Sequence, residues 1–160
     1  MSKDATPPTI YLDADACPVK DLVFRTAVRY EIPLKVVANT PIRIHPDAEK
    51  VAQSIVVPGS PDAADDWIAE HATAQDLVLT ADIPLAARAL AIGAACIDFR
   101  GNHFNPNRIG DALASRDLNA MLRQMGEITG GPPAFSKKDR SSFASAIDAA
   151  VNKLARKAAH

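Results

Sequence analysis

Aspartate residues follow several of the short apolar segments of this chain, and carboxylates in such positions can bind metal ions. The acids at the ends of predicted strands are Asp13 and Asp15 after residues 9–12, Asp82 after residues 77–80, and Asp98 at the end of residues 95–98. A further group, Asp62, Asp65 and Asp66, opens a predicted helix shortly after another strand. Because the carboxyl ends of parallel strands meet at one edge of a sheet, we expect several of these acids to lie close together.

Such a cluster would be electrostatically strained. Two carboxylates about 4 Å apart repel by about 4 kcal/mol at an effective dielectric constant of 20. A proton or a divalent cation relieves that repulsion, and hard oxygen ligands without Cys or His suit Mg²⁺ or Mn²⁺. Residues 51–87 hold six acids but no Lys or Arg, so no side-chain cation of that stretch neutralises them. The other interpretation is that these acids cap helices and form a solvated face.

Carboxylates that hold Mg²⁺ or Mn²⁺ commonly activate water for phosphodiester hydrolysis, so phosphoryl chemistry is the class that the acids predict. Two basic groups could contact substrate phosphates: Arg100, His103 and Arg108, and then Lys137, Lys138 and Arg140. The alternative for both groups is that they are solvated loop residues.

Two other mechanisms use the same region. The sequence Asp13-Ala14-Asp15 is similar to the D-x-D loop of haloacid-dehalogenase phosphatases, in which the first Asp is the nucleophile. The later residues of those enzymes come in the wrong order here, and no Lys lies between Lys50 and Lys137. Cys17 could be a nucleophile at a helix start, but none of the four histidines is a persuasive partner in the sequence, which favours a buried small residue.

The segments that must position the acids alternate between strand and helix. Apolar and β-branched runs predict strands, and apolar spacing of three and four predicts helices. The predicted strands are residues 9–12, 34–38, 54–57, 77–80 and 95–98, with residues 40–50 irregular. The predicted helices are residues 19–29, 62–72, 83–92, 109–125 and 136–159. This order predicts a three-layer α/β fold with a mainly parallel sheet and an additional C-terminal helix.

Length and composition are those of one ordinary globular domain. The chain has 160 residues, 48% of them hydrophobic, with a formal net charge of −1. A chain with so little net charge has no overall positive potential that would attract nucleic acid. Two distant cysteines predict no disulfide framework, and the absence of a signal peptide or an apolar span predicts a cytoplasmic protein with no membrane partner. We expect residues 1–8 to be flexible.

Several motifs together resemble one family over residues 10–151. They are DADACP at 13–18, VAN at 37–39, DAAD at 62–65, TADIPLA at 80–86, RG at 100–101 and TGGPP at 129–133. This combination resembles the YaiI/YqxD family. That family is grouped with PIN-like domains, many of which are metal-dependent nucleases with a carboxylate cluster at the carboxyl edge of a parallel sheet. The segment 129–160, with its Gly/Pro motif and basic helix, departs from a typical PIN nuclease.

The resemblance implies a role for each matching residue. Asp13, Asp65 and Asp82 would be the metal ligands, Asp15 and Asp66 auxiliary acids, and Thr80 a hydroxyl that orients a ligand. We therefore predict a single PIN-like domain over residues 1–160 that is a metal-dependent nuclease acting on RNA. The predicted catalytic residues are Asp13, Asp15, Asp65 and Asp82, the predicted cofactor is Mg²⁺ or Mn²⁺, and the predicted substrate-binding residues are Asn39 and Arg100. The alternatives are a non-catalytic RNA- or protein-binding module and, third, a phosphatase with Asp13 as nucleophile.

Overall fold

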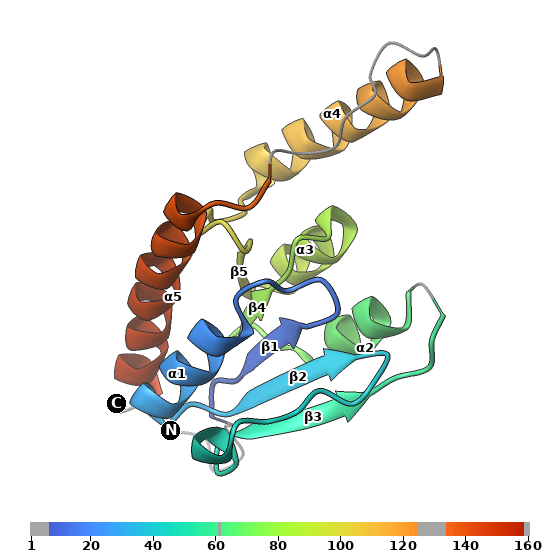
Figure 1. Ribbon diagram of the computed structural model, residues 1–160. Coiled ribbons are helices and arrows are strands. Elements are labelled where there is room, and N and C mark those ends of the chain that lie inside the picture. Colours follow the sequence, from blue (N-terminus) through green and yellow to red (C-terminus); the bar gives the residue numbers. More distant parts are fainter. Residues whose placement is uncertain (1–6, 61, 125–133, 159–160) are drawn as a thin grey trace.

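The computed structural model describes residues 7–60, 62–124 and 134–158 and contains one five-stranded parallel sheet (Figure 1). The strands are β1 (Ile10–Asp13), β2 (Leu34–Ala38), β3 (Ala52–Val56), β4 (Leu77–Leu79) and β5 (Ala95–Ile97). Their order across the sheet is β3-β2-β1-β4-β5. The predicted α/β fold is therefore confirmed, with all strand pairings parallel.

Helices cover both faces of this sheet. The helices are α1 (Lys20–Tyr30), α2 (Ala63–His71), α3 (Ile83–Ala91), α4 (Pro106–Gln124) and α5 (Lys137–Ala158). Helices α1 and α5 pack on one face, whereas α2 and α3 pack on the other. Helix α4 begins beside α3 and extends away from the sheet (Figure 1). No helix in the described ranges is both long enough and apolar enough to cross a membrane.

The buried side chains follow the alternation of the strands. In β1, Ile10 and Leu12 face α1 and α5, whereas Tyr11 faces α2 and α3. The apolar stripe of α5 that the sequence predicted is buried against the first of these cores, from Phe143 to Leu154. Since successive side chains alternate, Asp13 at the end of β1 faces the same side as Tyr11, toward α2 and α3.

The strand order places a topological switch point between β1 and β4. From β1 the chain proceeds outward through β2 to β3, and it then returns to β4 on the other side of β1. At such a point the loops after neighbouring strands separate to opposite faces and leave a crevice at the carboxyl edge. The acids after β1 and β4 flank that crevice.

The starts of β3 and α4 differ from the predictions. Strand β3 starts at Ala52 rather than residue 54, because Ala52 and Gln53 pair with Leu34 and Lys35 of the neighbouring strand. Helix α4 starts at Pro106 rather than residue 109, because the Asn105 side chain accepts a hydrogen bond from the Arg108 N–H and caps it. The β2–β3 connection contains only a short 3₁₀ turn, η1 (Pro46–Ala48), so residues 40–50 are irregular as predicted.

Candidate functional site

A chain of hydrogen bonds joins the acids that follow β1 and β4. The hydroxyl of Thr80 donates to Oδ2 of Asp13 at 2.7 Å, and the same hydroxyl oxygen accepts the backbone N–H of Asp82 at 2.9 Å. Thr80 is fully buried. The two acids of the switch point are therefore held in a fixed relation by one buried side chain.

Asp82 is in turn fixed by the start of α3. Its Oδ1 accepts the N–H of Leu85 at 2.8 Å, so Asp82 caps the helix that it precedes. No hydrogen bond among the described residues uses Oδ1 of Asp13 or Oδ2 of Asp82. One oxygen of each carboxylate is thus available at this edge.

Asp65 reaches the same edge from the first turn of α2, which packs against β1. Burial raises the pKa of the Asp65 carboxyl to about 7, and the negative charges of Asp82 and Asp13 add to that effect. Burial, together with Asp82 and Asp15, also raises the pKa of Asp13, although the Thr80 hydrogen bond opposes the rise. Asp13, Asp65 and Asp82 therefore form one electrostatically coupled group, which we call the acidic edge.

A cation does lie beside this group, although none comes from residues 51–87. Arg88 of α3 is the next residue beyond that stretch, and its Nη1 lies 2.8 Å from Oδ1 of Asp66. It also lowers the pKa of Asp65, but by less than burial and the neighbouring acids raise it. Asp66 is thus engaged with α3 on an exposed surface, and only Asp65 of this pair joins the acidic edge.

Asp15 and Asn39 form a separate contact between the loops after β1 and β2. Both carboxylate oxygens of Asp15 accept the backbone N–H of Asn39, each at 3.1 Å. Both side chains are exposed. The structure thus brings Asn39 to the same edge as Asp15, and the amide side chain of Asn39 remains accessible.

Arg100 and Asp98 lie at the end of β5 and have other partners. Arg100 Nη1 lies 2.8 Å from Oδ2 of Asp139 at the start of α5, and Asp98 pairs with Arg108 at 2.5 Å. The turn that holds them also uses Asp98 Oδ1 to accept the N–H of Arg100 and of Asn102. Asp98 is therefore part of an ion-pair network rather than of the acidic edge.

The second basic group is divided between an ion pair and solvent. Arg140 pairs with Asp21 of α1, whereas Lys137 and Lys138 are exposed. Asp62 occupies the N-cap position of α2 without a side-chain capping bond. The Gly/Pro motif at 129–133 lies outside the described residues.

Cys17 is buried beneath the loop that follows β1. Its Sγ accepts the N–H of Val19 at 3.4 Å, and burial raises the pKa of the thiol to about 11. A thiol with such a pKa is protonated at neutral pH and is a poor nucleophile. The expectation of a buried small residue agrees with this environment.

The donor chemistry of the acidic edge fits a hard divalent cation, but the side chains are not arranged around one. In residues 7–60, 62–124 and 134–158, no group of three or more His, Cys, Asp or Glu side chains is placed so that it could hold a metal ion. The three acids nevertheless supply oxygen donors only, and their mutual repulsion favours a cation between them. Mg²⁺ or Mn²⁺ at this edge therefore stays a prediction.

Comparison with known proteins confirms the family resemblance that the sequence motifs indicated. The model of the YaiI/YqxD family, described as uncharacterized, matches residues 11–153. A UPF0178 protein of Trichlorobacter lovleyi is 49% identical over 152 residues, covering 94% of this chain and 97% of its own. UPF0178 proteins of Brucella ovis (50% over 151 residues, 94% and 93% covered) and Rhodopseudomonas palustris (51% over 152 residues, 94% of each) are similarly related. No solved structure matches the chain.

Proposed function

We propose that this chain, which belongs to the YaiI/YqxD family, is a divalent-cation-dependent nuclease that hydrolyses phosphodiester bonds in RNA. The observation that carries the proposal is the convergence of Asp13, Asp65 and Asp82 at the crevice between β1 and β4. These acids come from three separate segments of the chain, and helix capping accounts for only one of them, Asp82. A cluster of that kind is costly to fold, so it indicates a function.

The acids differ in how firmly the protein holds them. Thr80 orients Asp13, and the start of α3 orients Asp82, each through one carboxylate oxygen. The Asp65 carboxyl makes no hydrogen bond to any described residue, and its raised pKa allows it to carry a proton that reduces the charge of the cluster near neutral pH. We infer that Asp13 and Asp82 form the rigid part of the cation site and that Asp65 turns toward a cation when one binds.

Mg²⁺ or Mn²⁺ bound by these carboxylates would supply a water of lowered pKa and positive charge beside the reacting phosphate. Asp15 is best suited to a supporting role, because both of its oxygens hold the loop that carries Asn39. The accessible Asn39 side chain is then placed to contact substrate. The proposal includes membership of the PIN-like group of nucleases, whose carboxyl-edge acids the motif resemblance implies.

The test is cleavage of end-labelled single-stranded RNA with Mg²⁺ or Mn²⁺, with EDTA, and with Asp82→Asn. Asn is also a good N-cap, so this change should leave α3 and the melting temperature intact. We expect EDTA to abolish cleavage and Asp82→Asn to reduce its rate by about two orders of magnitude, since a cation ligand contributes several kcal/mol to the transition state.

Asp111→Asn is the matched control, because Asp111 is an exposed acid of α4 outside the acidic edge. Its activity should equal that of the wild type. Cleavage that persists in EDTA, or that Asp82→Asn retains in full, would contradict the proposal. Salt-dependent RNA binding without any turnover would instead support the non-catalytic module.

A further inference from the structure

Strand β3 lies at one edge of the sheet, and β2 is the only strand of the described residues that pairs with it. We call the other side of residues 52–56 the open edge. Natural proteins protect such an edge with a charge, a proline, a bulge or a covering segment, because its unpaired N–H and C=O groups can pair with another strand. The sequence of β3, AQSIV, has no charged residue and no proline, and its register with β2 is continuous, without a bulge.

The opposite edge of the sheet, β5, is covered by the turn that follows it. The N–H of Phe104 donates to the backbone oxygen of Cys96 at 2.9 Å, and Ile97 forms an antiparallel bridge with His103. The chain therefore folds back along β5 and occupies its outer side. Of the two edges of this sheet, only β3 lacks that protection.

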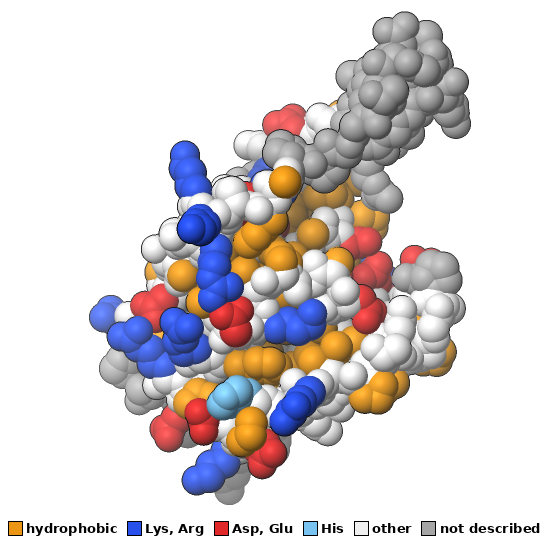
Figure 2. All heavy atoms as spheres, viewed as in Figure 1, with side chains coloured by type: hydrophobic (Ala, Val, Ile, Leu, Met, Phe, Trp, Pro, Cys, Tyr) orange, Lys and Arg blue, Asp and Glu red, His pale blue; other side chains and the backbone are white. Residues whose placement is uncertain are grey.

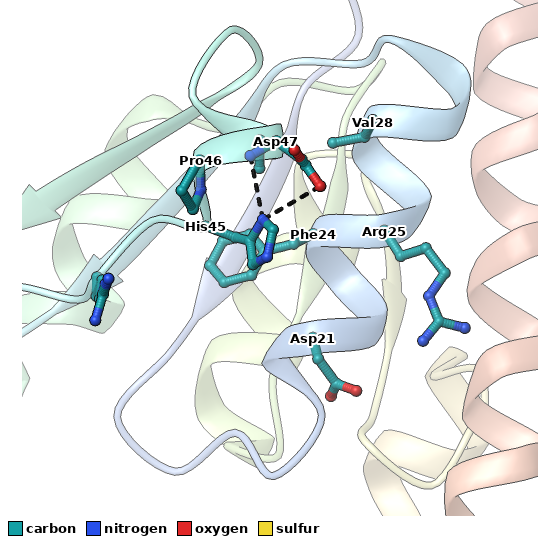
Figure 3. Close-up of a pocket in the computed structure, with 9 residues that line it drawn as sticks. Asp21, Phe24, Arg25, Val28, His45, Pro46 and Asp47 are labelled. Atoms are coloured by element: carbon teal, nitrogen blue, oxygen red, sulfur yellow. Dashed lines mark hydrogen bonds and ion pairs between the residues drawn. The ribbon is translucent and has the colours of Figure 1, made fainter.

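The β2–β3 connection does not cover the open edge, because it packs over the face of the sheet that α1 covers. Figure 3 shows His45, at the start of η1, beside Phe24 of α1. Nearer to β2, the N–H of Ile42 donates to Oγ of Ser54 at 3.4 Å. The side chains of Ser54 and Ala52 point to this same face, since side chains alternate along a strand. The connection thus lies over one face of β3 and leaves its outer backbone groups accessible.

Hydrogen bonds at the two ends of β3 show which of its backbone groups face outward. The N–H of Leu34 donates to the oxygen of Val51 at 2.8 Å, and the N–H of Val57 donates to the oxygen of Ala38 at 3.0 Å. Because the backbone groups of successive residues point to opposite sides of a strand, the odd-numbered residues of 51–57 face β2. The residues whose N–H and C=O face outward are Ala52, Ser54 and Val56. None of them makes a backbone hydrogen bond to a described residue outside the sheet.

Val56 gives the open edge an apolar surface. Its side chain is 53% exposed, which equals the exposure of Met121 and exceeds that of every other large hydrophobic residue that the structure describes. Figure 2 shows hydrophobic and uncharged groups where β3 ends, whereas Lys and Arg side chains gather over α1 and α5. A partner at this edge is therefore recognised by backbone pairing and apolar contact rather than by charge.

We propose that the open edge pairs with β3 of a second copy of this chain, antiparallel and about a two-fold axis at Ser54. In this register Ser54 lies opposite Ser54 of the other copy, and Ala52 lies opposite Val56. All three outward residues of each copy are then paired, and the exposed Val56 side chain gains an apolar neighbour. No like charges oppose one another, because β3 is uncharged. Such an isologous contact is the commonest form of protein self-association.

The pairing leaves the acidic edge open. The two β3 strands run in opposite directions, so the carboxyl edges of the two sheets lie at opposite ends of the pair. The inference is therefore independent of the proposed nuclease function, and each can fail without the other.

The first test is sedimentation velocity of the full chain from about 2 to 200 μM, because a contact of five residues is smaller than a standard interface and should give a dissociation constant in the micromolar range. We expect dimers to form as concentration rises. Val56→Lys places a hydrated charge on the open edge and should weaken dimerisation about tenfold or more. Met121→Lys is the matched control, because Met121 is equally exposed but lies on α4. It should dimerise like the wild type.

The second test fixes the register by disulfide cross-linking. Ser54→Cys places two thiols opposite each other at the axis, and mild oxidation should link the two copies. Gln53→Cys is the control, because residues 53 of the two copies are offset by two positions and their Cα atoms lie beyond the limit of about 7 Å for a disulfide. The native Cys17 and Cys96 are buried and do not compete. The inference is overturned if the wild type stays monomeric throughout, if Met121→Lys weakens dimerisation as much as Val56→Lys, or if Gln53→Cys cross-links as readily as Ser54→Cys.

Discussion

At the residue scale, Thr80 has more influence on the acidic edge than its size suggests. Its hydroxyl donates to Asp13 and accepts from the N–H of Asp82, so it fixes acids that lie 69 positions apart in the chain. Because Thr80 is fully buried, the Asp13 carboxylate and the Asp82 N–H could not exchange their bonds to its hydroxyl for bonds to bulk water without a cost in folding free energy. The position therefore requires a hydroxyl as well as a β-branched shape.

Thr80→Val should lower the free energy of unfolding by about 1–3 kcal/mol, since it keeps the shape but leaves the Asp82 N–H without its partner. Thr80→Ser keeps the hydroxyl and should lose only the value of one methyl group, about 1 kcal/mol. Urea denaturation of the three proteins measures both effects. Equal midpoints for Thr80→Val and the wild type would mean that the hydroxyl contributes nothing.

Some residues of the site could be predicted from sequence and others could not. Asp13, Asp65 and Asp82 were identifiable because each stands at a strand end or a helix start, and the motifs supported them. The contacts of Asp66 with Arg88 and of Asp15 with the backbone of Asn39 depend on how separate segments pack.

At the element scale, the alternation of strands and helices was predictable from the spacing of apolar residues along the chain. Short apolar runs or alternation every second residue indicate strands, whereas apolar residues three and four positions apart indicate helices. Errors occur where the apolar signal is weak. Strand β3 is at the edge of the sheet, and its second register pair, Gln53 with Lys35, is polar. Helix α4 begins with a capping Asn and a Pro. Side-chain capping and edge-strand pairing are tertiary or polar effects that hydrophobic periodicity does not report.

The turn after β5 provides a test of how α5 is docked. Gly101 has a φ of +88°, and a Cβ on it would lie 2.5 Å from the backbone oxygen of Ser142 in α5. Gly101→Ala should therefore destabilise the protein by about 2–4 kcal/mol, through backbone strain and through displacement of α5. Thermal unfolding followed by circular dichroism measures this loss.

Gly110→Ala is the control for that experiment. Gly110 lies within α4, and a Cβ there has nothing within 4 Å. The change should be neutral or stabilise the protein by about 0.5–1 kcal/mol, because Ala is the better helix former. Equal effects of the two changes would show that contact with α5 does not constrain the turn.

At the scale of the whole molecule, the strand order explains why the acids meet. A parallel sheet with β1 and β4 adjacent at its centre brings residues 13 and 82 to one crevice, and α2 then adds residue 65. The sequence predicted parallel strands but not their order, because order depends on which crossover each connection makes. The acidic edge was still predictable, because the carboxyl ends of parallel strands meet at one edge of the sheet whatever the order of the strands.

The acidic edge should make the stability of the metal-free protein fall as pH rises. Burial and the neighbouring acids raise the pKa of folded Asp65 to about 7, from an ordinary value of 3.8. A group whose folded pKa is raised contributes stability below its unfolded pKa and loses that contribution as pH rises through its folded pKa. The stability in EDTA should therefore decrease between about pH 4 and pH 7.

Asp65→Asn has no such titration and should remove this part of the pH dependence. Near pH 4 the variant and the wild type should be nearly equally stable. Above about pH 7 the variant should be more stable by about 1–3 kcal/mol. This difference is smaller than the full pKa shift would give, because solvent screens the charges of the site. Urea denaturation in EDTA across this range measures the difference, and Asp66→Asn, paired with Arg88, is the adjacent control. If Asp65→Asn and the wild type depend on pH identically, Asp65 is not coupled to the acidic edge. If Mg²⁺ or Mn²⁺ restores wild-type stability at high pH but leaves Asp65→Asn unchanged, the cation and the proton relieve the same repulsion.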